Sequence, residues 1–334
     1  TANKWLLAEH GNEIFAAAEA KGVYVAFEVA VAGGVPIIKV LREGLAANRV
    51  DWLAGIINGT GNFILTEMRD KGRDFADVLV EAQALGYAEA DPAFDVEGID
   101  AAHKLTIMAS LAFGIPLQFD KAYIEGITQL TRDDVAYAEE LGYRIKHLGI
   151  ARRTADGIEL RVHPTLIPAE RLIANVHGVK NAILVQSDPV GPTLYYGAGA
   201  GAGPTASAVV ADIVDLVRSL TAESSPNVPH LAFMPQAIAA TPILDMEAVV
   251  TSYYLRLQAE DKPGVLADVT RILSSRGISI EAIVQKPVQA EGAVPVIILT
   301  NPVLEREMNR AIAELEALSD IVGAVTRIRL ETLA

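Results

Sequence analysis

Helical periodicity dominates the first 141 residues of the chain. An apolar stripe at helical spacing ends at Gly22 and predicts a helix over residues 5–21. β-branched runs predict strands over residues 23–32 and 50–57. Further helices are predicted over residues 36–41, 58–68, 75–85, 97–113 and 132–141.

From Tyr143 onward the pattern changes to an alternation of apolar and polar residues, which is typical of half-buried strands. We therefore expect a mostly antiparallel sheet with helices on one side. A Gly-rich run then leads into a helix, and a segment rich in serine and proline predicts a linker. The strands are predicted over residues 144–151, 158–163, 182–186 and 193–196, the helix over 204–220 and the linker over 221–249, with Ser224, Ser225 and Pro226 at its start.

Residues 250–334 predict a separate unit. Their elements follow the order βαββαβ, which is the ferredoxin-like pattern, and the first helix carries its apolar residues on one stripe. The predicted fold class is therefore α/β and α+β. The strands are expected over residues 252–259, 278–286, 293–300 and 323–331, and the helices over 264–275 and 303–318.

Composition excludes several classes of function. The 334 residues are 51% hydrophobic, and a net charge of −14 argues against nonspecific binding to nucleic acid, which needs basic patches. No apolar run reaches the length of about 18 residues that crosses a membrane, and the N-terminus lacks the build of a secretion signal. Cysteine is absent, which excludes disulfides and thiolate metal sites and permits a reducing compartment such as the cytoplasm.

The stretch from Glu89 to Lys104 carries the clearest candidate chemistry. It places five carboxylates and one lysine around a Pro-marked loop that runs into a helix. Asp100 and Lys104 stand four residues apart, so a helix places both on one face, where the lysine can donate a proton. The alternative is a solvated salt bridge. The apolar run that begins at Leu105 favours an ion pair beside a core element.

The same stretch resembles homoserine dehydrogenase, through Gly86-Tyr87-Ala88-Glu89-Ala90-Asp91-Pro92 followed by Asp95, Gly98, Asp100 and Lys104. That family reduces aspartate semialdehyde to homoserine with NADH or NADPH. The resemblance implies that Lys104 donates the proton, with Lys4 and Asp100 as further catalytic residues. It also implies that Glu89, Asp95 and Asp100 bind the substrate.

Three other motifs extend this resemblance. Asn58, Gly59 and Thr60 match a turn whose N–H groups can hold the substrate carboxylate; capping of the helix by Thr60 is the alternative. The N-terminal Thr-Ala-Asn-Lys matches the end of a dinucleotide-binding strand, and the Gly-rich run 197–203 matches a loop at the cofactor cleft, with a flexible hinge as its alternative. The implied cofactor contacts are Ala2, Asn3, Lys4, Gly86, Gly199 and Gly201.

Residues 27–36 resemble the family segment that binds a monovalent cation such as sodium. Hard cations take oxygen ligands, which a carboxylate and backbone carbonyls can supply. The implied ligands are Glu28 and the carbonyls of Val31, Gly33 and Val35. The alternative is a strand-to-helix turn with a capping glutamate.

Residues 261–266 resemble the signature of ACT domains, which are modules that bind amino acids at a paired interface. An ordinary strand-to-helix turn is the alternative. The resemblance implies feedback control by threonine and a homodimer or homotetramer. The implied effector contacts are Asp261, Gly264, Val265 and Leu266, where glycine lets the backbone approach a ligand.

The resemblance also implies the domain organisation. Residues 1–26 and 197–220 are expected to belong to a Rossmann nucleotide-binding domain, residues 27–196 to the catalytic and dimerisation domain, and residues 250–334 to the ACT domain. The chain has no first-strand dinucleotide fingerprint, so we expect its natural start to lie upstream of Thr1 and the chain alone to be inactive. Two alternatives remain, a non-catalytic amino-acid sensor and another NAD(P)-dependent dehydrogenase.

Overall fold

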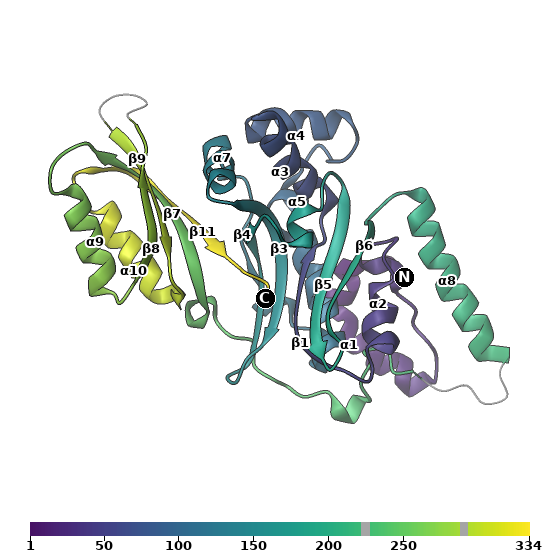
Figure 1. The fold of residues 1–334 in the computed structure, drawn as a ribbon. Coiled ribbons are helices and arrows are strands. Elements are labelled where there is room, and N and C mark those ends of the chain that lie inside the picture. The colour runs from purple at the N-terminus through teal and green to yellow at the C-terminus, as the bar shows by residue number, and fades with distance from the viewer. Residues whose placement is uncertain (222–227, 288–292) are drawn as a thin grey trace.

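A computed structural model gives the fold of the protein (Figure 1). It describes residues 1–221, 228–287 and 293–334, so the predicted linker residues Ser224, Ser225 and Pro226 lie outside it. Among the helices in these ranges, none is long and apolar enough to cross a membrane.

The described strands form one 11-stranded sheet that runs through the molecule (Figure 1). Its order is β6-β5-β1-β3-β4-β11-β7-β9-β8, with β2 beside β4 and β10 beside β7. Strand β4 pairs in parallel with β2 and β11, and the other pairs are antiparallel, as the sequence predicts. The strands are β1 Arg49–Ile56, β2 Tyr123–Ile124, β3 Tyr143–Arg153, β4 Ile158–Pro168, β5 Lys180–Asp188, β6 Gly191–Ala198, β7 Val250–Glu260, β8 Ile280–Gln285, β9 Ala293–Thr300, β10 Val303–Leu304 and β11 Ile321–Leu330.

One long buried helix, α6, organises the first core. It packs on β1, β3 and β4 and against α1. Because these elements bury most of its surface, most of its side chains are apolar. Gly98, with a φ of 88°, separates α6 from the short helix α5. The helices are α1 Lys4–Lys21, α2 Ile37–Lys39, α3 Gly59–Lys71, α4 Phe75–Ala84, α5 Ala93–Val96, α6 Ile99–Phe113, α7 Arg132–Glu140, α8 Ala202–Thr221, α9 Val265–Ser275 and α10 Glu305–Glu316.

The C-terminal residues form the predicted ferredoxin-like module, with the strand order β11-β7-β9-β8. Helices α9 and α10 lie together beside this part of the sheet (Figure 1). Val265, Val269 and Leu273 form the buried stripe of α9 and join an apolar cluster with the strands. Burial of this stripe is what holds the helix to the module, because an isolated helix of this length is marginal in water.

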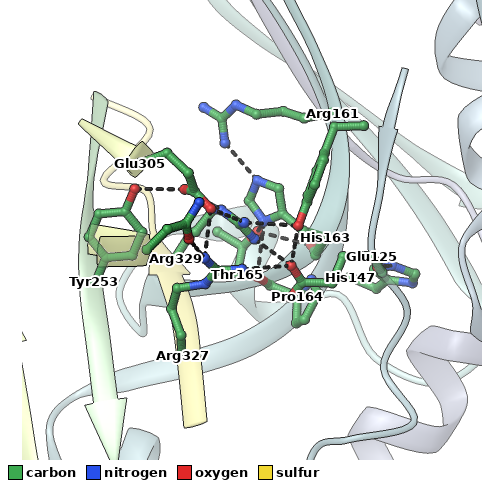
Figure 2. A network of polar contacts seen from close by, with 12 residues as sticks. Glu125, His147, Arg161, His163, Pro164, Thr165, Tyr253, Glu305, Arg327 and Arg329 are labelled. Carbon is green, nitrogen blue, oxygen red and sulfur yellow. Dashed lines mark hydrogen bonds and ion pairs between the residues drawn. The ribbon is translucent and has the colours of Figure 1, made fainter. Parts of the chain in front are cut away.

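The module is joined to the rest of the molecule through its last strand. Arg329 and Leu330 of β11 pair in parallel with Thr165 and Leu166 of β4, so both parts share one sheet. A network of buried charged side chains surrounds this junction (Figure 2). The junction is therefore fixed both by backbone pairing and by ion pairs.

The predicted strand over residues 23–32 is wrong. Residues 28–30 form a 3₁₀ turn and residues 31–34 a further turn. The N–H of Val25 donates to Nε2 of His230 at 3.0 Å, and the terminal ammonium of Thr1 donates to the carbonyl of Ala26 at 2.6 Å. These backbone groups are satisfied by a side chain and by the chain terminus rather than by a neighbouring strand. Most other predicted elements are present within a few residues.

Candidate active site

A cleft of about 430 Å³ lies where the starts of α1, α3 and α6 approach the strand ends of β5 and β6. It collects residues that are up to 197 positions apart in the sequence. The lining residues are Lys4, Asn58, Gly59, Thr60, Gly86, Tyr87, Asp95, Asp100, Lys104, Val179, Lys180, Asn181, Ala198, Gly199, Ala200 and Gly201.

Two lysines share one carboxylate in this cleft. Nζ of Lys104 lies 2.7 Å from Oδ2 of Asp100, and Nζ of Lys4 lies 3.1 Å from Oδ1. Lys104 also donates to the carbonyl of Ile57 at 2.8 Å. An ammonium group has three N–H donors, so these two bonds leave Lys104 one donor for a ligand.

Asn58 connects this ion cluster to the turn at the start of α3. Its Nδ2 donates to Asp95 at 2.7 Å and to Asp100 at 2.9 Å, while its Oδ1 accepts from the N–H of Gly61 at 2.7 Å. Asn58 is therefore the cap of α3, and the alternative interpretation, capping by Thr60, is wrong. Thr60 instead donates to the carbonyl of Tyr87 at 2.6 Å.

Burial and charge act in opposite directions on the two aspartates. Burial opposes ionisation of Asp100, but the ammonium groups of Lys104 and Lys4 outweigh it and lower the pKa of that carboxyl. Burial raises the pKa of Asp95, although the hydrogen bond from Asn58 opposes this rise. The lowered pKa favours the ionised form of Asp100, whose two oxygens contact both lysines.

The structure does not bring every predicted site residue into the cleft. The side chain of Glu89 is exposed and is not among the lining residues, and its described contact is the carbonyl oxygen, which accepts from Gln83 at 3.0 Å. Asn3 caps α1 by accepting from the N–H of Leu6 at 3.0 Å, and Ala2 is exposed. Gly86, Gly199 and Gly201 line the cleft, as the cofactor prediction requires.

Six lining residues were not among the contacts predicted from the sequence: Tyr87, Val179, Lys180, Asn181, and Ala198 and Ala200 of the Gly-rich run. Asn181 is 1% exposed, and in the described part of the chain its Nδ2 has no hydrogen-bond partner. Tyr87 lies within the motif from Gly86 to Pro92, so the sequence could have indicated it as a site residue. The start of β5 carries no such signal, because only the pairing of β5 with β1 brings it beside the turn at Gly59.

Comparison with known proteins identifies the family of this site. A family model described as homoserine dehydrogenase matches residues 36–214, and one described as ACT domain matches residues 253–320. A homoserine dehydrogenase of Pseudomonas aeruginosa is 68% identical over 334 residues, which are all of this chain and 77% of that protein. The chain belongs to the homoserine dehydrogenase family.

Solved structures of homoserine dehydrogenases agree with this fold. The one from Thiobacillus denitrificans has a TM-score of 0.95 and 69% identity, over 100% of this chain and 76% of that chain. A hyperthermophilic archaeal homoserine dehydrogenase in complex with NADPH has a TM-score of 0.59 and 28% identity, over 68% of this chain and 65% of that chain.

The Gly-rich run of this homoserine dehydrogenase packs tightly against the turn at Gly33 and Gly34. A Cβ added at Gly33 would lie 2.8 Å from the carbonyl oxygen of Gly199, and one added at Gly34 would lie 2.8 Å from that of Ala198. A Cβ at Gly199 would overlap the amide of Asn181. The absence of side chains at these positions therefore allows two backbone segments to pack closely. A flexible hinge, which was the alternative interpretation of the Gly-rich run, would not require such close packing.

We expect Gly199→Ala and Gly203→Ala to have opposite effects on stability. Gly199→Ala should cost about 1–3 kcal/mol because the new methyl group has no room beside Asn181. Gly203 lies in α8 with nothing within 4 Å of an added Cβ, so alanine should be neutral or stabilise by up to about 1 kcal/mol. Equilibrium unfolding in urea measures both. Equal changes in the two variants would contradict this assignment of the Gly-rich run.

The predicted cation ligand Glu28 has another use in the structure. Its two carboxylate oxygens accept from the N–H groups of Ile38 at 3.0 Å and Lys39 at 2.8 Å. Burial raises the pKa of Glu28 to about 7, against the effect of these two bonds. This is the capping glutamate of the alternative interpretation. The described residues include no group of three or more His, Cys, Asp or Glu side chains that could hold a metal ion.

The predicted effector residues also lie together. Asp261, Gly264, Val265 and Leu266 line a hollow of about 200 Å³ between the start of α9 and strands β8 and β9. Gly264 caps α9 with a φ of 99°, which a side chain would strain. Asp261 accepts from Nε2 of Gln285 at 3.5 Å. Unpaired N–H groups at this helix start can meet a carboxylate.

Proposed function

We propose that this protein reduces L-aspartate 4-semialdehyde to L-homoserine with NADH or NADPH. The observation that carries the proposal is the cluster of Lys4, Asp100 and Lys104 in a cleft beside the Asn58 turn. Homoserine dehydrogenases use NAD(P), and the archaeal relative binds NADPH. The catalytic family model also favours the enzyme over an amino-acid sensor.

Residues of the chain would hold the cofactor on the glycine side of the cleft. Gly86 and Gly201 have no side chains there, which leaves room for a flat ring, and the backbone of Gly199 lies against Asn181. NAD(P)H, when bound, supplies a hydride to the aldehyde carbon of the substrate. Lys4 also lines the cleft and adds a positive charge there. The predicted contacts of Ala2 and Asn3 with the cofactor remain predictions.

Lys104 would stabilise the oxygen that gains charge in this step. The carbonyl oxygen becomes negative as the aldehyde carbon is reduced, and the free N–H of the Lys104 ammonium donates to it and then transfers its proton. The product is an alcohol, and Lys104 is left neutral until solvent reprotonates it. Asp100 positions both lysines throughout, because its ionised carboxylate accepts from each.

The substrate carries an ammonium and a carboxylate besides its aldehyde. Asp95 offers an acceptor for the ammonium group, and the predicted contact of Glu89 requires its exposed side chain to turn toward the cleft. The turn at Asn58, Gly59 and Thr60 presents the N-terminal end of α3, which favours a carboxylate. Both groups are attached to the α-carbon, so contacts that hold them there would leave the aldehyde at the other end of the substrate to face Lys104.

Oxidation of NADPH in the presence of aspartate semialdehyde tests the proposal. We would assay the chain and a hybrid in which it replaces the matched 334 residues of the Pseudomonas aeruginosa relative. Turnover by the hybrid at a rate near that of the relative is expected. A folded hybrid that binds threonine but does not oxidise NADPH would support the amino-acid sensor instead.

We further propose that the ACT module binds an amino acid such as threonine at the hollow beside Gly264. Calorimetric titration of the chain with L-threonine should show binding, and Gly264→Ala should weaken it about tenfold, because a methyl group there obstructs the approach of a ligand to the backbone. Gly323→Ala is the matched control, since Gly323 also has a positive φ, of 75°, but lies outside the hollow. No heat with millimolar threonine and a folded chain would exclude this ligand.

The sodium site, the oligomer and the cytoplasmic location remain predictions. The carbonyls of Val31, Gly33 and Val35 would have to complete a cation site in which Glu28 already accepts two N–H bonds. Exchange of sodium for tetramethylammonium at constant ionic strength tests the cation through the melting temperature. Light scattering tests the homodimer or homotetramer. The assignment of residues 1–26 and 197–220 to a nucleotide-binding domain is supported by a hollow that both ranges line, with Tyr24 on one side and Asp212 of α8 on the other.

A further inference from the structure

A short segment, residues 125–128, lies between the ACT module and the start of the catalytic helix α6. Oε2 of Glu125 accepts from Nη1 of Arg329 at 2.8 Å and lies 3.5 Å from Nη2 of Arg327, both on β11 (Figure 2). The hydroxyl of Tyr123 donates to the same oxygen at 2.6 Å. The module thus contacts the segment through one carboxylate.

The two arginines are themselves anchored inside the module. Nε of Arg329 donates to Oε2 of Glu305 at 2.9 Å, and Nη1 of Arg327 lies 2.9 Å from Oε1. Tyr253 donates to Glu305 at 2.7 Å. The side chains of Arg329 and Glu305 are 0% and 2% exposed. A buried, multiply bonded pair of this kind has one geometry, so it sets the position of Glu125.

On its other side the segment contacts Val96 and Glu97, which lie just before the start of α6. The N–H of Ile127 donates to the carbonyl of Val96 at 2.9 Å, and Oγ1 of Thr128 donates to Glu97 at 3.1 Å. A Cβ added at Gly126 would lie 2.8 Å from the carbonyl oxygen of Val96. The segment therefore lies directly on the backbone that leads into the helix.

His147 of β3 adds a second contact between the segment and this helix start. Its Nε2 donates to the carbonyl of Glu125 at 2.9 Å, which requires a proton on that nitrogen. Its ring lies against Gly98, where an added Cβ would be 3.0 Å from Cε1. Gly98 has a φ of 88° and is the residue from which α6 begins. Asp100 follows two residues later and Lys104 one turn after that.

We propose that Glu125 is a positioning residue, through which the ACT module fixes the start of α6 and hence the catalytic pair Asp100 and Lys104. The proposal rests on the proposed function for the roles of that pair. Displacement of a catalytic group by about 1 Å can cost about a hundredfold in rate. A smaller shift of the helix start therefore has a measurable effect on kcat while the substrate contacts at Asn58 remain.

Truncation of Glu125 and of Arg152 gives a matched comparison. Arg152 of β3 also forms an ion pair with the last residues of the module, to Glu331 at 2.8 Å, but it has no described hydrogen bond or ion pair with residues 96–98 or 125–128. The side chains are equally exposed, at 27% for Glu125 and 26% for Arg152. Both alanine variants should therefore lose a comparable interaction with the module.

Two readouts separate positioning from mere stability. In the chain itself, hydrogen exchange of peptides that cover residues 96–104 should become severalfold faster in Glu125→Ala and remain unchanged in Arg152→Ala. In the hybrid, Glu125→Ala should lower kcat about tenfold with little change in KM, and Arg152→Ala should retain the parent kcat.

Equal exchange at residues 96–104 in the two variants would overturn the proposal, whatever their melting temperatures. Faster exchange in Glu125→Ala with an unchanged kcat would also overturn it, because the helix start would then move without consequence for the chemistry. A parent hybrid that fails to reduce aspartate semialdehyde would instead refute the proposed function. The exchange experiment needs no turnover and would still decide whether Glu125 holds the start of α6.

Discussion

Replacement of Lys104 by methionine is expected to lower kcat of the hybrid enzyme by about 10³-fold, with a change in KM of less than about threefold. Methionine fills most of the space of the lysine stem but cannot donate to the oxygen that gains charge. Asp100 keeps Lys4 and Asn58 as partners in this variant, so its carboxylate remains paired. The measurement is the steady-state oxidation of NADPH at varied concentrations of aspartate semialdehyde.

Lys121→Met is the control for this prediction. Lys121 is exposed and bonds to Gln118 at 2.8 Å, and it is not among the lining residues of the cleft. Its replacement should leave kcat and KM at their parent values. An unchanged kcat in Lys104→Met would remove Lys104 from the chemistry. A large rise in KM with unchanged kcat would make it a residue that binds ground and transition states equally.

Replacement of Arg329 by methionine is expected to lower the free energy of unfolding by about 3 kcal/mol at neutral pH. The reason is that Glu305, 2% exposed, would lose two of its charge-assisted bonds, and Arg327 would remain as its one ionic partner among the described residues. A buried carboxylate that loses most of its charge-assisted bonds is no longer compensated for its desolvation. Equilibrium unfolding in urea, followed by circular dichroism, measures the loss.

The effect of Arg329→Met should shrink as the pH falls. In the parent protein burial opposes ionisation of Glu305, but its bonds to Arg329 outweigh burial and lower its pKa. A carboxyl whose pKa is lower in the folded state than in the unfolded state stabilises the protein at pH values above its unfolded pKa. This stabilisation is lost as the pH falls through the folded-state pKa. In the variant fewer bonds oppose the effect of burial, so Glu305 protonates more readily as the pH falls and avoids part of the penalty. A loss that is equal at neutral pH and at about pH 4 would contradict the ionic explanation.

Arg306→Met provides the matched control for charge and size. Arg306 is 51% exposed and lies 3.7 Å from Glu307 in the next position of α10. Exposed pairs contribute at most about 1 kcal/mol, because water solvates both groups and salt screens them. The two arginines are in the same module, so a difference between them reports burial rather than the loss of an arginine.

Local sequence patterns were sufficient for most elements and for the module. The helix over α1 and the βαββαβ order follow from apolar spacing within a few tens of residues, and the structure confirms both. Asp100 and Lys104 are four residues apart on one helix, so their contact also follows from helix geometry. Such features depend on neighbours along the chain.

Features that depend on contacts between residues far apart in the chain could not be predicted from local sequence patterns. Residues 23–32 have the composition of a strand, yet their backbone bonds to the N-terminus and to His230. Glu28 matches a predicted cation ligand, but the local pattern does not contain the two N–H groups from which its oxygens accept. In each case a partner that the pattern does not contain decides the outcome.

The sequence by itself determined the acid-rich loop, the ion pair of Asp100 and Lys104 on α6 and the elements of the ACT module, because these depend on spacing along one segment. Only the tertiary structure decided that Lys4 forms an ion pair with Asp100 and that Lys180 and Asn181 line the cleft. It also decided that Glu125 lies between the module and α6. These contacts join residues that are far apart in sequence. Their geometry follows from how the strands of one sheet are ordered, which no local pattern specifies.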